Sequence, residues 1–93
     1  MLRSFRSKAL RRYWTKSDAS GLRPDWVTRV SRHLDALDQA TSPEEMNYVG
    51  SGFHALTGDQ RGRYALTVSR NWRLTFGWEG TDAVDIDLED YDG

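Results

Sequence analysis

The sequence contains the stretch Gly58-Asp-Gln-Arg-Gly-Arg-Tyr-Ala-Leu-Thr-Val-Ser-Arg-Asn-Trp-Arg-Leu-Thr-Phe-Gly-Trp-Glu79. Large apolar side chains alternate with small or polar ones on both sides of the polar segment Ser69-Arg70-Asn71. Period-two alternation of β-forming residues predicts two half-buried strands, and three polar residues between them fit a hairpin turn. One face of this hairpin is strongly apolar, so other parts of the chain must cover it.

The second face of the predicted hairpin carries Arg73 among small residues. A cation on a rigid strand, with little bulk around it, is suited to an anionic ligand. An ion pair between Arg73 and a neighbouring acid, such as Asp85 or Asp87, remains the alternative.

The composition predicts a single domain spanning residues 1–93, a length sufficient for one hydrophobic core. The sequence has no cysteine, which excludes disulfides and thiolate metal sites and suits a reducing cytoplasm. With His33 and His54 as the only histidines, we expect neither a metal nor another cofactor. No apolar run approaches the roughly 18 residues of a membrane span, so we expect a cytoplasmic protein without membrane contacts.

The two parts of the chain carry opposite charge. Residues 1–33 contain nine Lys or Arg and two acids, a net charge of +7, whereas residues 34–93 contain four Arg and twelve acids, a net charge of −8. A basic surface suits a polyanion, because neutralised phosphates release their counterions. Two ordinary solvated surfaces remain the alternative.

Capping and periodicity signals predict the remaining elements. Ser7 can cap a first helix that runs to Lys16, and Pro24 suits the first turn of a second helix that ends near Gln39. Shorter elements are expected as an edge strand over 2–5, a capped helical turn over 41–45, a strand over 53–56, a loop over 58–62 and a last strand over 84–89. This order predicts a small α+β fold, with N-terminal helices packed on one face of an antiparallel or mixed sheet of about four strands.

Side-chain patterns predict which faces of these elements are buried. The second helix has an apolar stripe, and Arg29, Arg32 and His33 lie largely off it. After the short helical turn, apolar burial is expected for Met46, Tyr48 and Val49. In the last strand, the apolar residues that alternate with acids should share one face; they are Val84, Ile86 and Leu88.

Several longer motifs occur in order along nearly the whole chain. They are Phe5 ahead of a basic helix, Leu34-Asp-Ala-Leu-Asp-Gln-Ala40 followed by Thr41-Ser-Pro-Glu-Glu45, Phe53-His54-Ala-Leu56, Gly58-Asp59 with Gly62, Thr67-Val68, Asn71-Trp72-Arg73-Leu-Thr-Phe76, and Val84-Asp85-Ile86-Asp87 running into Glu89-Asp90-Tyr91. Together they resemble the HigB-type toxins of the RelE superfamily, from bacterial type II toxin–antitoxin systems.

The resemblance implies a RelE-like fold and an endoribonuclease that cuts mRNA on the ribosome. No metal is expected, because the 2′-OH of the RNA attacks the adjacent phosphate. The implied partners are the ribosome with its mRNA and a cognate HigA-type antitoxin with a helix-turn-helix domain. Operator DNA would be reached only through that antitoxin.

Cleavage of this kind needs a group that takes the 2′-OH proton, one that stabilises charge on the phosphate and one that protonates the leaving oxygen. Arg73 fits the second task, because its guanidinium fork matches two phosphate oxygens. His54 fits the first task, since an ordinary imidazole pKa near 6.5 leaves much of the ring neutral at pH 7. A histidine that orients substrate, or an ordinary surface histidine, remains the alternative for His54.

Three C-terminal residues complete the predicted catalytic set. Asp90 would position a neighbour, or is one more surface acid. Tyr91 would stack on a base or hydrogen-bond the phosphate, or pins the tail to the sheet. Asp92 fits an ionised base or a passenger better than an acid, because an acid would need a pKa far above the usual value near 3.9.

Two positions depart from the family pattern. The family usually has lysine where this chain has Thr57, and histidine where it has Asp92. Both changes remove a group that assists cleavage, so we expect a weaker nuclease, and replacing Asp92 with histidine should raise mRNA cleavage on ribosomes. A protein of this fold that mainly binds its antitoxin and modulates transcription remains one alternative, and a general RNA-binding domain is another.

Exposed cations outside the catalytic set are candidates for contacts to ribosomal RNA. These are Lys8, Arg11, Arg12, Arg29, Arg32, Arg61 and Arg63. Such contacts would position the protein without reading sequence. A solvated helix face is the alternative for some of them.

Overall fold

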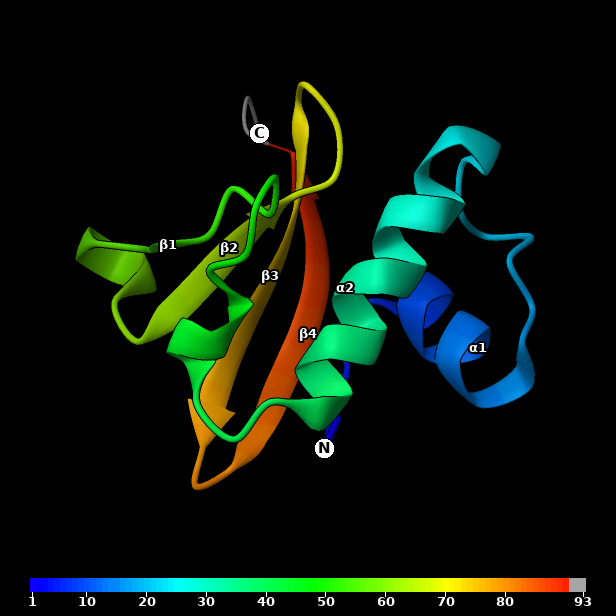
Figure 1. Cartoon of the computed structure of the whole chain (residues 1–93). Coiled ribbons are helices and arrows are strands. Elements are labelled where there is room, and N and C mark those ends of the chain that lie inside the picture. Colours follow the sequence, from blue (N-terminus) through cyan, green and yellow to red (C-terminus); the bar gives the residue numbers. More distant parts are fainter. Residues whose placement is uncertain (91–93) are drawn as a thin grey trace.

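A computed structural model gives the fold of residues 1–90, in which two α-helices lie beside a four-stranded sheet (Figure 1). The helices are α1 (Lys8–Lys16) and α2 (Val27–Gln39), and the strands are β1 (His54–Ala55), β2 (Arg63–Thr67), β3 (Trp72–Glu79) and β4 (Asp82–Asp90). The strands follow one another across the sheet in chain order, and each neighbouring pair is antiparallel. The predicted α+β fold is confirmed.

The central hairpin forms where the alternation predicts it. Leu66 pairs with Leu74, and Tyr64 pairs with Phe76. At the turn, the backbone N–H of Val68 donates to the carbonyl of Trp72 over 3.0 Å. The apolar face of this hairpin is covered by α2 and by the segment over 40–53 (Figure 1).

The N-terminal segment covers the edge of β4, although it makes only isolated bridges there. Leu2 and Phe5 bridge to β4 in parallel, so the sheet is mixed at this edge. Arg3 pairs with Glu79 over 2.7 Å and with Asp82 over 3.6 Å. The predicted edge strand is thus reduced to two bridges and ion pairs, which keep the edge from pairing with another chain.

Both helices begin and end close to the predicted residues. Ser7 caps α1, because its Oγ accepts a hydrogen bond of 3.2 Å from the N–H of Leu10. A 3₁₀ turn, Pro24–Trp26, leads into α2, which ends at Gln39. Among the residues described, neither helix has the length and apolar character needed to cross a membrane.

The segment after α2 has the predicted capped turn, formed by the 3₁₀ helix Pro43–Met46. Ser42 and Glu45 cap each other's backbone in a capping box, and Met46 is fully buried. The expected burial of Val49 is wrong, because this side chain is 92% exposed. Val49 lies in a turn with Gly50, whose φ is +82°, and the chain is buried again at Ser51.

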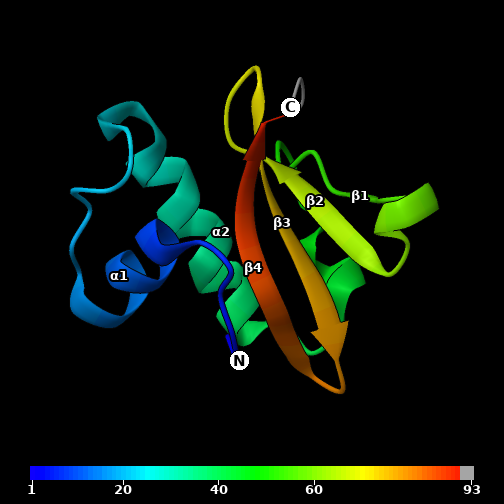
Figure 2. The same cartoon turned by 180° about the vertical axis from the view of Figure 1, so that it is seen from behind.

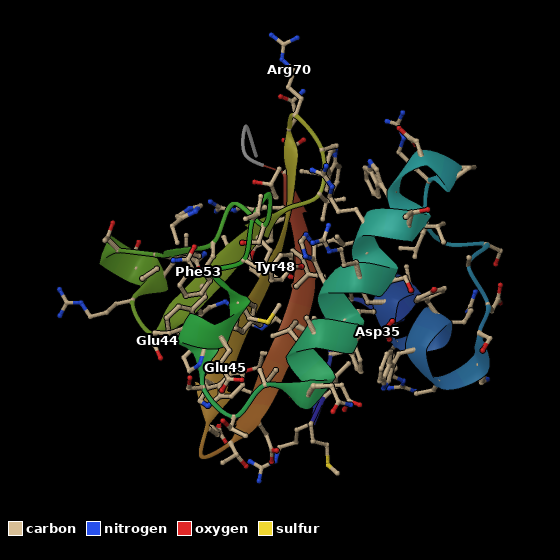
Figure 3. All side chains as sticks on the ribbon, viewed as in Figure 1. Asp35, Glu44, Glu45, Tyr48, Phe53 and Arg70 are labelled. Carbon is tan, nitrogen blue, oxygen red and sulfur yellow. The ribbon has the colours of Figure 1, made fainter. Side chains whose placement is uncertain are left out.

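His33 was expected off the apolar stripe of α2, but its side chain is only 1% exposed. Its Nε2 lies 2.8 Å from the carbonyl oxygen of Thr67, and its Nδ1 is hydrogen-bonded to the hydroxyl of Tyr48. A carbonyl only accepts, so Nε2 carries the proton and the Tyr48 hydroxyl donates to Nδ1. Tyr48 therefore lies between α2 and the sheet (Figure 3), and His33 ties α2 to the end of β2.

Burial lowers the pKa of His33 from its ordinary value. The hydrogen bond to Thr67 acts in the opposite direction, and the positive charges of Arg29 and Arg32 lower the pKa further. His33 is a buried polar residue that the structure satisfies in its neutral form.

β4 contains a bulge that the alternating pattern does not predict. The register with β3 shifts between Thr75 and Gly77, and Asp85 adopts a φ of +50°. Val84 lies opposite Gly77 on the face away from the helices, whereas Ile86 joins the core cluster. The prediction that Val84 shares a face with Ile86 and Leu88 is therefore wrong, because one extra residue in a strand reverses the side-chain order.

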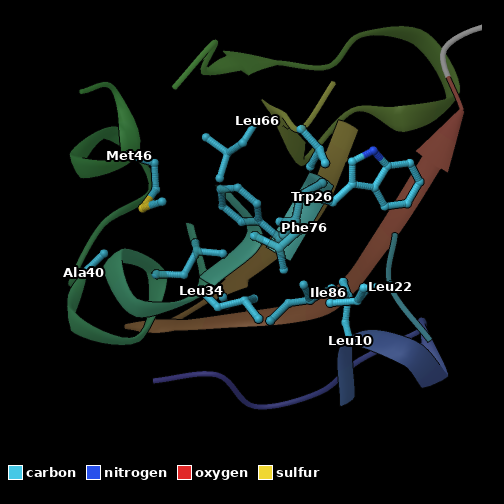
Figure 4. Close-up of a cluster of buried hydrophobic side chains, with 14 residues drawn as sticks. Leu10, Leu22, Trp26, Leu34, Ala40, Met46, Leu66, Phe76 and Ile86 are labelled. Carbon is cyan, nitrogen blue, oxygen red and sulfur yellow. The ribbon is translucent and has the colours of Figure 1, made fainter. Parts of the chain in front are cut away.

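The hydrophobic core fills the space between the helices and the sheet (Figure 4). Leu10 of α1, Leu34 of α2, Phe76 of β3 and Ile86 of β4 are all fully buried in it. Trp26 closes one end of the core against Trp72, with ring centroids 5.1 Å apart. The opposite face of the sheet carries no helix and is called the open face below (Figure 2).

Candidate functional site

The candidate site lies on the open face. Two rows of paired residues cross this face, namely Thr67–Arg73–Glu89 and His54–Ala65–Thr75–Asp87. Adjacent strands lie about 4.8 Å apart and residues rise about 3.4 Å along a strand, so the Cα atoms of His54 and Arg73 are roughly 12 Å apart. The sheet thus brings these two predicted catalytic residues to one surface.

Arg73 is the second residue of β3, and it is half-buried. Its Nε is buried against the sheet. The acid directly opposite it on β4 is Glu89. The two acids considered from the sequence do not lie opposite Arg73. The carboxylate of Asp85 lies 3.9 Å from the guanidinium of Arg6, and Asp87 lies in the neighbouring row, opposite Thr75.

His54 opens β1 and is exposed. Its Nδ1 lies 3.1 Å from the carbonyl oxygen of Gly52, so Nδ1 carries a proton and Nε2 is the basic nitrogen of the neutral ring. Gly52 packs tightly on β2: a Cβ there would lie 2.1 Å from Oγ1 of Thr67. The loop ahead of His54 is therefore held close to the strand that adjoins Arg73.

Arg63 differs from the sequence expectation of an outward-facing RNA contact. Its side chain is 11% exposed, and its Nη2 donates to Oγ1 of Thr75 over 3.0 Å and to the carbonyl of Asp85 over 2.8 Å. Gly77 lies beside this guanidinium, because a Cβ there would be in ordinary contact with Nη1, 3.7 Å away. We therefore leave Arg63 out of the RNA surface, because its guanidinium is committed to contacts within the sheet.

Burial lowers the pKa of the Arg63 guanidinium, and the positive charge of Arg6 lowers it further. The carboxylates of Glu89, Asp85 and Asp87 oppose this effect. An arginine still remains protonated at neutral pH, because its delocalised guanidinium holds its proton far above that range. Arg63 is therefore a fixed positive charge beneath the open face.

Glu89 is a residue of this site that the sequence pattern treats only as one acid among several. The hydroxyl of Thr75 donates to its Oε2, and Nη2 of Arg63 lies 4.0 Å from the same oxygen. A regular hairpin continued from the Glu79–Asp82 pair would place Leu88 opposite Arg73. The β4 bulge moves Glu89 there instead, so only a prediction of the bulge could have found it.

The remaining predicted catalytic residues are placed differently or lie beyond the described chain. Asp90 is exposed and pairs with Trp72, one residue away from the row of Arg73. Tyr91 and Asp92 lie outside the described residues. Thr57, where the family usually has lysine, is exposed just ahead of the 3₁₀ helix Gly58–Gln60.

The other predicted RNA-binding cations are exposed on separate elements. Lys8, Arg11 and Arg12 line a shallow pocket of about 210 Å³ along α1. Arg29 and Arg32 line a second pocket of about 350 Å³ beside Tyr48, with the Arg32 guanidinium 4.8 Å from the ring centroid. The predicted RNA-binding cations that line each pocket come from a single helix.

Arg61 lies in the loop before β2, and Arg70 is at the tip of the hairpin, pointing away from the body of the protein (Figure 3). Within residues 1–90, the His, Asp and Glu side chains form no group of three that could hold a metal ion. The open face instead combines a guanidinium, an imidazole and a carboxylate on a rigid sheet. Such a set can bind a phosphate and transfer protons beside it.

Known toxins resemble this chain over nearly its whole length. Residues 3–91 match the family described as the RelE-like toxin of type II toxin–antitoxin system HigB. The endoribonuclease HigB of Proteus vulgaris is 37% identical over 91 residues, which cover 98% of this chain and 99% of that protein. The chain therefore belongs to the HigB family of RelE-like toxins of type II toxin–antitoxin systems.

Proposed function

We propose that this protein is an endoribonuclease that cleaves mRNA on the ribosome and thereby inhibits translation. The 2′-OH of the RNA attacks the adjacent phosphate, and no metal ion takes part. The proposal is carried by one observation: Arg73 and His54 share the open face of a rigid sheet in a chain of the HigB family. The name of the Proteus vulgaris relative supports the reaction class.

Each of these side chains has a chemical role in the proposal. The Arg73 guanidinium donates to two oxygens of the scissile phosphate and stabilises the charge that develops there. Nε2 of His54 transfers a proton at the reacting oxygens, since Nδ1 is engaged by Gly52. Asp90, Tyr91 and Asp92 complete the site on the strength of the family motif, and the departures at Thr57 and Asp92 weaken it.

The exposed cations of α1 and α2, together with Arg61, position the protein on ribosomal RNA. Contacts of this kind are made to phosphates, so binding should weaken as salt rises. As a type II toxin the protein has an antitoxin as its partner. We further propose that this antitoxin is of the HigA type, that it carries the contact to operator DNA, and that the complex acts in the cytoplasm.

The experiment is single-turnover cleavage of mRNA on programmed ribosomes by Arg73→Ala. Loss of one preorganised donor should lower the rate by about 10²–10³-fold, relieve growth arrest and leave antitoxin binding intact. Arg70→Ala is the matched control, because Arg70 is an arginine of the same hairpin that points away from the site. Absence of cleavage by the unaltered protein, or cleavage by Arg73→Ala at the unaltered rate, would contradict the proposal.

A further inference from the structure

Glu89 stands on the side of Arg73 opposite to His54. The strand order places His54 on β1, Arg73 on β3 and Glu89 on β4, and all three face away from the helices. Side chains directly opposite each other in an antiparallel pair have Cβ atoms about 5 Å apart. A phosphate held by Arg73 would therefore have the imidazole on one side and the carboxylate on the other.

The Glu89 carboxylate is fixed from within the sheet. Its Oε2 accepts a hydrogen bond from the fully buried hydroxyl of Thr75, which in turn accepts from Arg63 over 3.0 Å. Glu89 itself keeps 24% of its side chain exposed. One carboxylate oxygen is thus oriented by buried partners while part of the group remains accessible from solvent.

The chemistry of the reaction assigns different roles to the two groups. In a displacement at phosphorus the attacking and leaving oxygens are roughly in line, so the proton acceptor and the proton donor stand on opposite sides. A glutamate carboxylate carries no proton at neutral pH and can only accept one, whereas an imidazole can accept or donate a proton. Glu89 therefore suits the attacking oxygen, and His54 suits the leaving oxygen.

We propose that Glu89 is the general base of RNA cleavage and that His54 is the general acid, an inference that rests on the proposed function. Glu89 takes the proton of the 2′-OH while the 2′-oxygen forms its bond to phosphorus. The bond between phosphorus and the 5′-oxygen breaks, and protonated His54 gives its Nε2 proton to that oxygen. The products are a 2′,3′-cyclic phosphate and a 5′-hydroxyl, and the sequence-based assignment of His54 as the base is reversed.

The first test is single-turnover cleavage of mRNA on programmed ribosomes by Glu89→Gln. This change keeps the side-chain length and an oxygen that can accept from Thr75, but removes the base, so the rate should fall by about 10²–10⁴-fold. Asp87→Asn is the matched control, because Asp87 lies on the same strand and the same face, in the neighbouring row. It should cleave within about twofold of the unaltered rate, as expected of a surface acid outside the reaction.

A second measurement separates catalysis from positioning. An mRNA with sulfur in place of the bridging 5′-oxygen at the cut site has a leaving group that needs no protonation. On this substrate His54→Ala should regain most of its lost rate, and Glu89→Gln should regain none. A purely structural role for Glu89 would not produce this difference.

The outcomes are distinct. Three results would overturn the inference: full activity of Glu89→Gln, rescue of Glu89→Gln by the sulfur substrate, or an equal loss of rate in Asp87→Asn. In each case the proposed function survives if Arg73→Ala is inactive in the same assay. An unaltered protein that cuts no RNA would overturn both. If circular dichroism shows that Glu89→Gln is unfolded, Glu89→Asp takes its place, because it retains a carboxylate on a side chain that is one methylene shorter. Its cleavage rate should be low, and the sulfur substrate should not raise that rate.

Discussion

Each face of the β2–β3 hairpin has a fully buried side chain, but the two side chains are covered in different ways. Phe76 and Thr75 are neighbours in β3, point to opposite faces and are both fully buried. Phe76 is covered by the helices, in an apolar core between two layers. Thr75 is covered by side chains of its own face, because Arg63 and Glu89 close over its hydroxyl.

This difference shows how one hairpin combines an apolar, stabilising face with a charged face that solvent can reach. On the covered face, apolar area is removed from water, which contributes about 25 cal/mol per Å². On the open face, a charged layer only one side chain deep satisfies its own hydrogen bonds and leaves Arg73, Glu89 and His54 reachable from solvent. The first face tolerates loss of contacts poorly, and the second tolerates loss of polar partners poorly.

The largest effect on stability is expected from Phe76→Ala. Truncating a fully buried phenylalanine should lower the free energy of unfolding by about 3–5 kcal/mol, because a cavity remains in the core. That is a large fraction of the roughly 5–14 kcal/mol expected for a domain of this length. Urea unfolding followed by circular dichroism measures it, and a loss below about 1 kcal/mol would mean that the core is not packed as described.

A smaller loss of stability is expected from Thr75→Val on the open face. The change keeps the shape but removes one of the two acceptors of Arg63 Nη2 and the hydroxyl that donates to Glu89, which should cost about 1–3 kcal/mol of unfolding free energy. Cleavage should also fall, because Glu89 loses its orientation. Thr75→Ser keeps the hydroxyl and is the matched control for the lost hydrogen bonds; equal behaviour of the two variants would argue against them.

The smallest effect is expected from pH, through the buried polar residue on the covered side. The pKa of His33 is lowered by burial, so below about pH 6.5 the unfolded chain binds the proton first and the folded protein loses stability. Stability should therefore rise with pH up to about 6.5 and then gain nothing more from His33. Urea midpoints between pH 5 and 8 measure this slope, and His33→Gln should remove it; the same slope in the variant would assign it to other groups.

Much of the fold was predictable because its signals are local. The alternation on either side of residues 69–71 fixes the hairpin, Ser7 fixes the start of α1, and α2 ends at Gln39 as its stripe indicates. The ordered motifs also indicated the family, which the match over residues 3–91 confirms. Local patterns failed where burial depends on partners far along the chain, as for His33 with Tyr48 and Thr67.

Some residues of the candidate site could likewise be predicted from the sequence, and others could not. Arg73 and His54 were predicted as site residues from residue type, strand position and family resemblance, and the sheet places both on the open face. Arg63 looked like one more exposed cation, because its sequence neighbours do not reveal that Thr75 and the carbonyl of Asp85 accept from its guanidinium. Glu89 was indistinguishable from the other acids of its strand.

By itself, the sequence determined the elements, the apolar face that drives them together and the family to which the chain belongs. Periodicity and capping act within a few residues, so they can be read without knowing the rest of the molecule. Only the tertiary structure decided which acid faces Arg73, because the bulge at Asp85 shifts the β3–β4 register by one residue. A shift of one residue exchanges the two faces of a strand, and register depends on packing across the sheet rather than on the strand's own sequence.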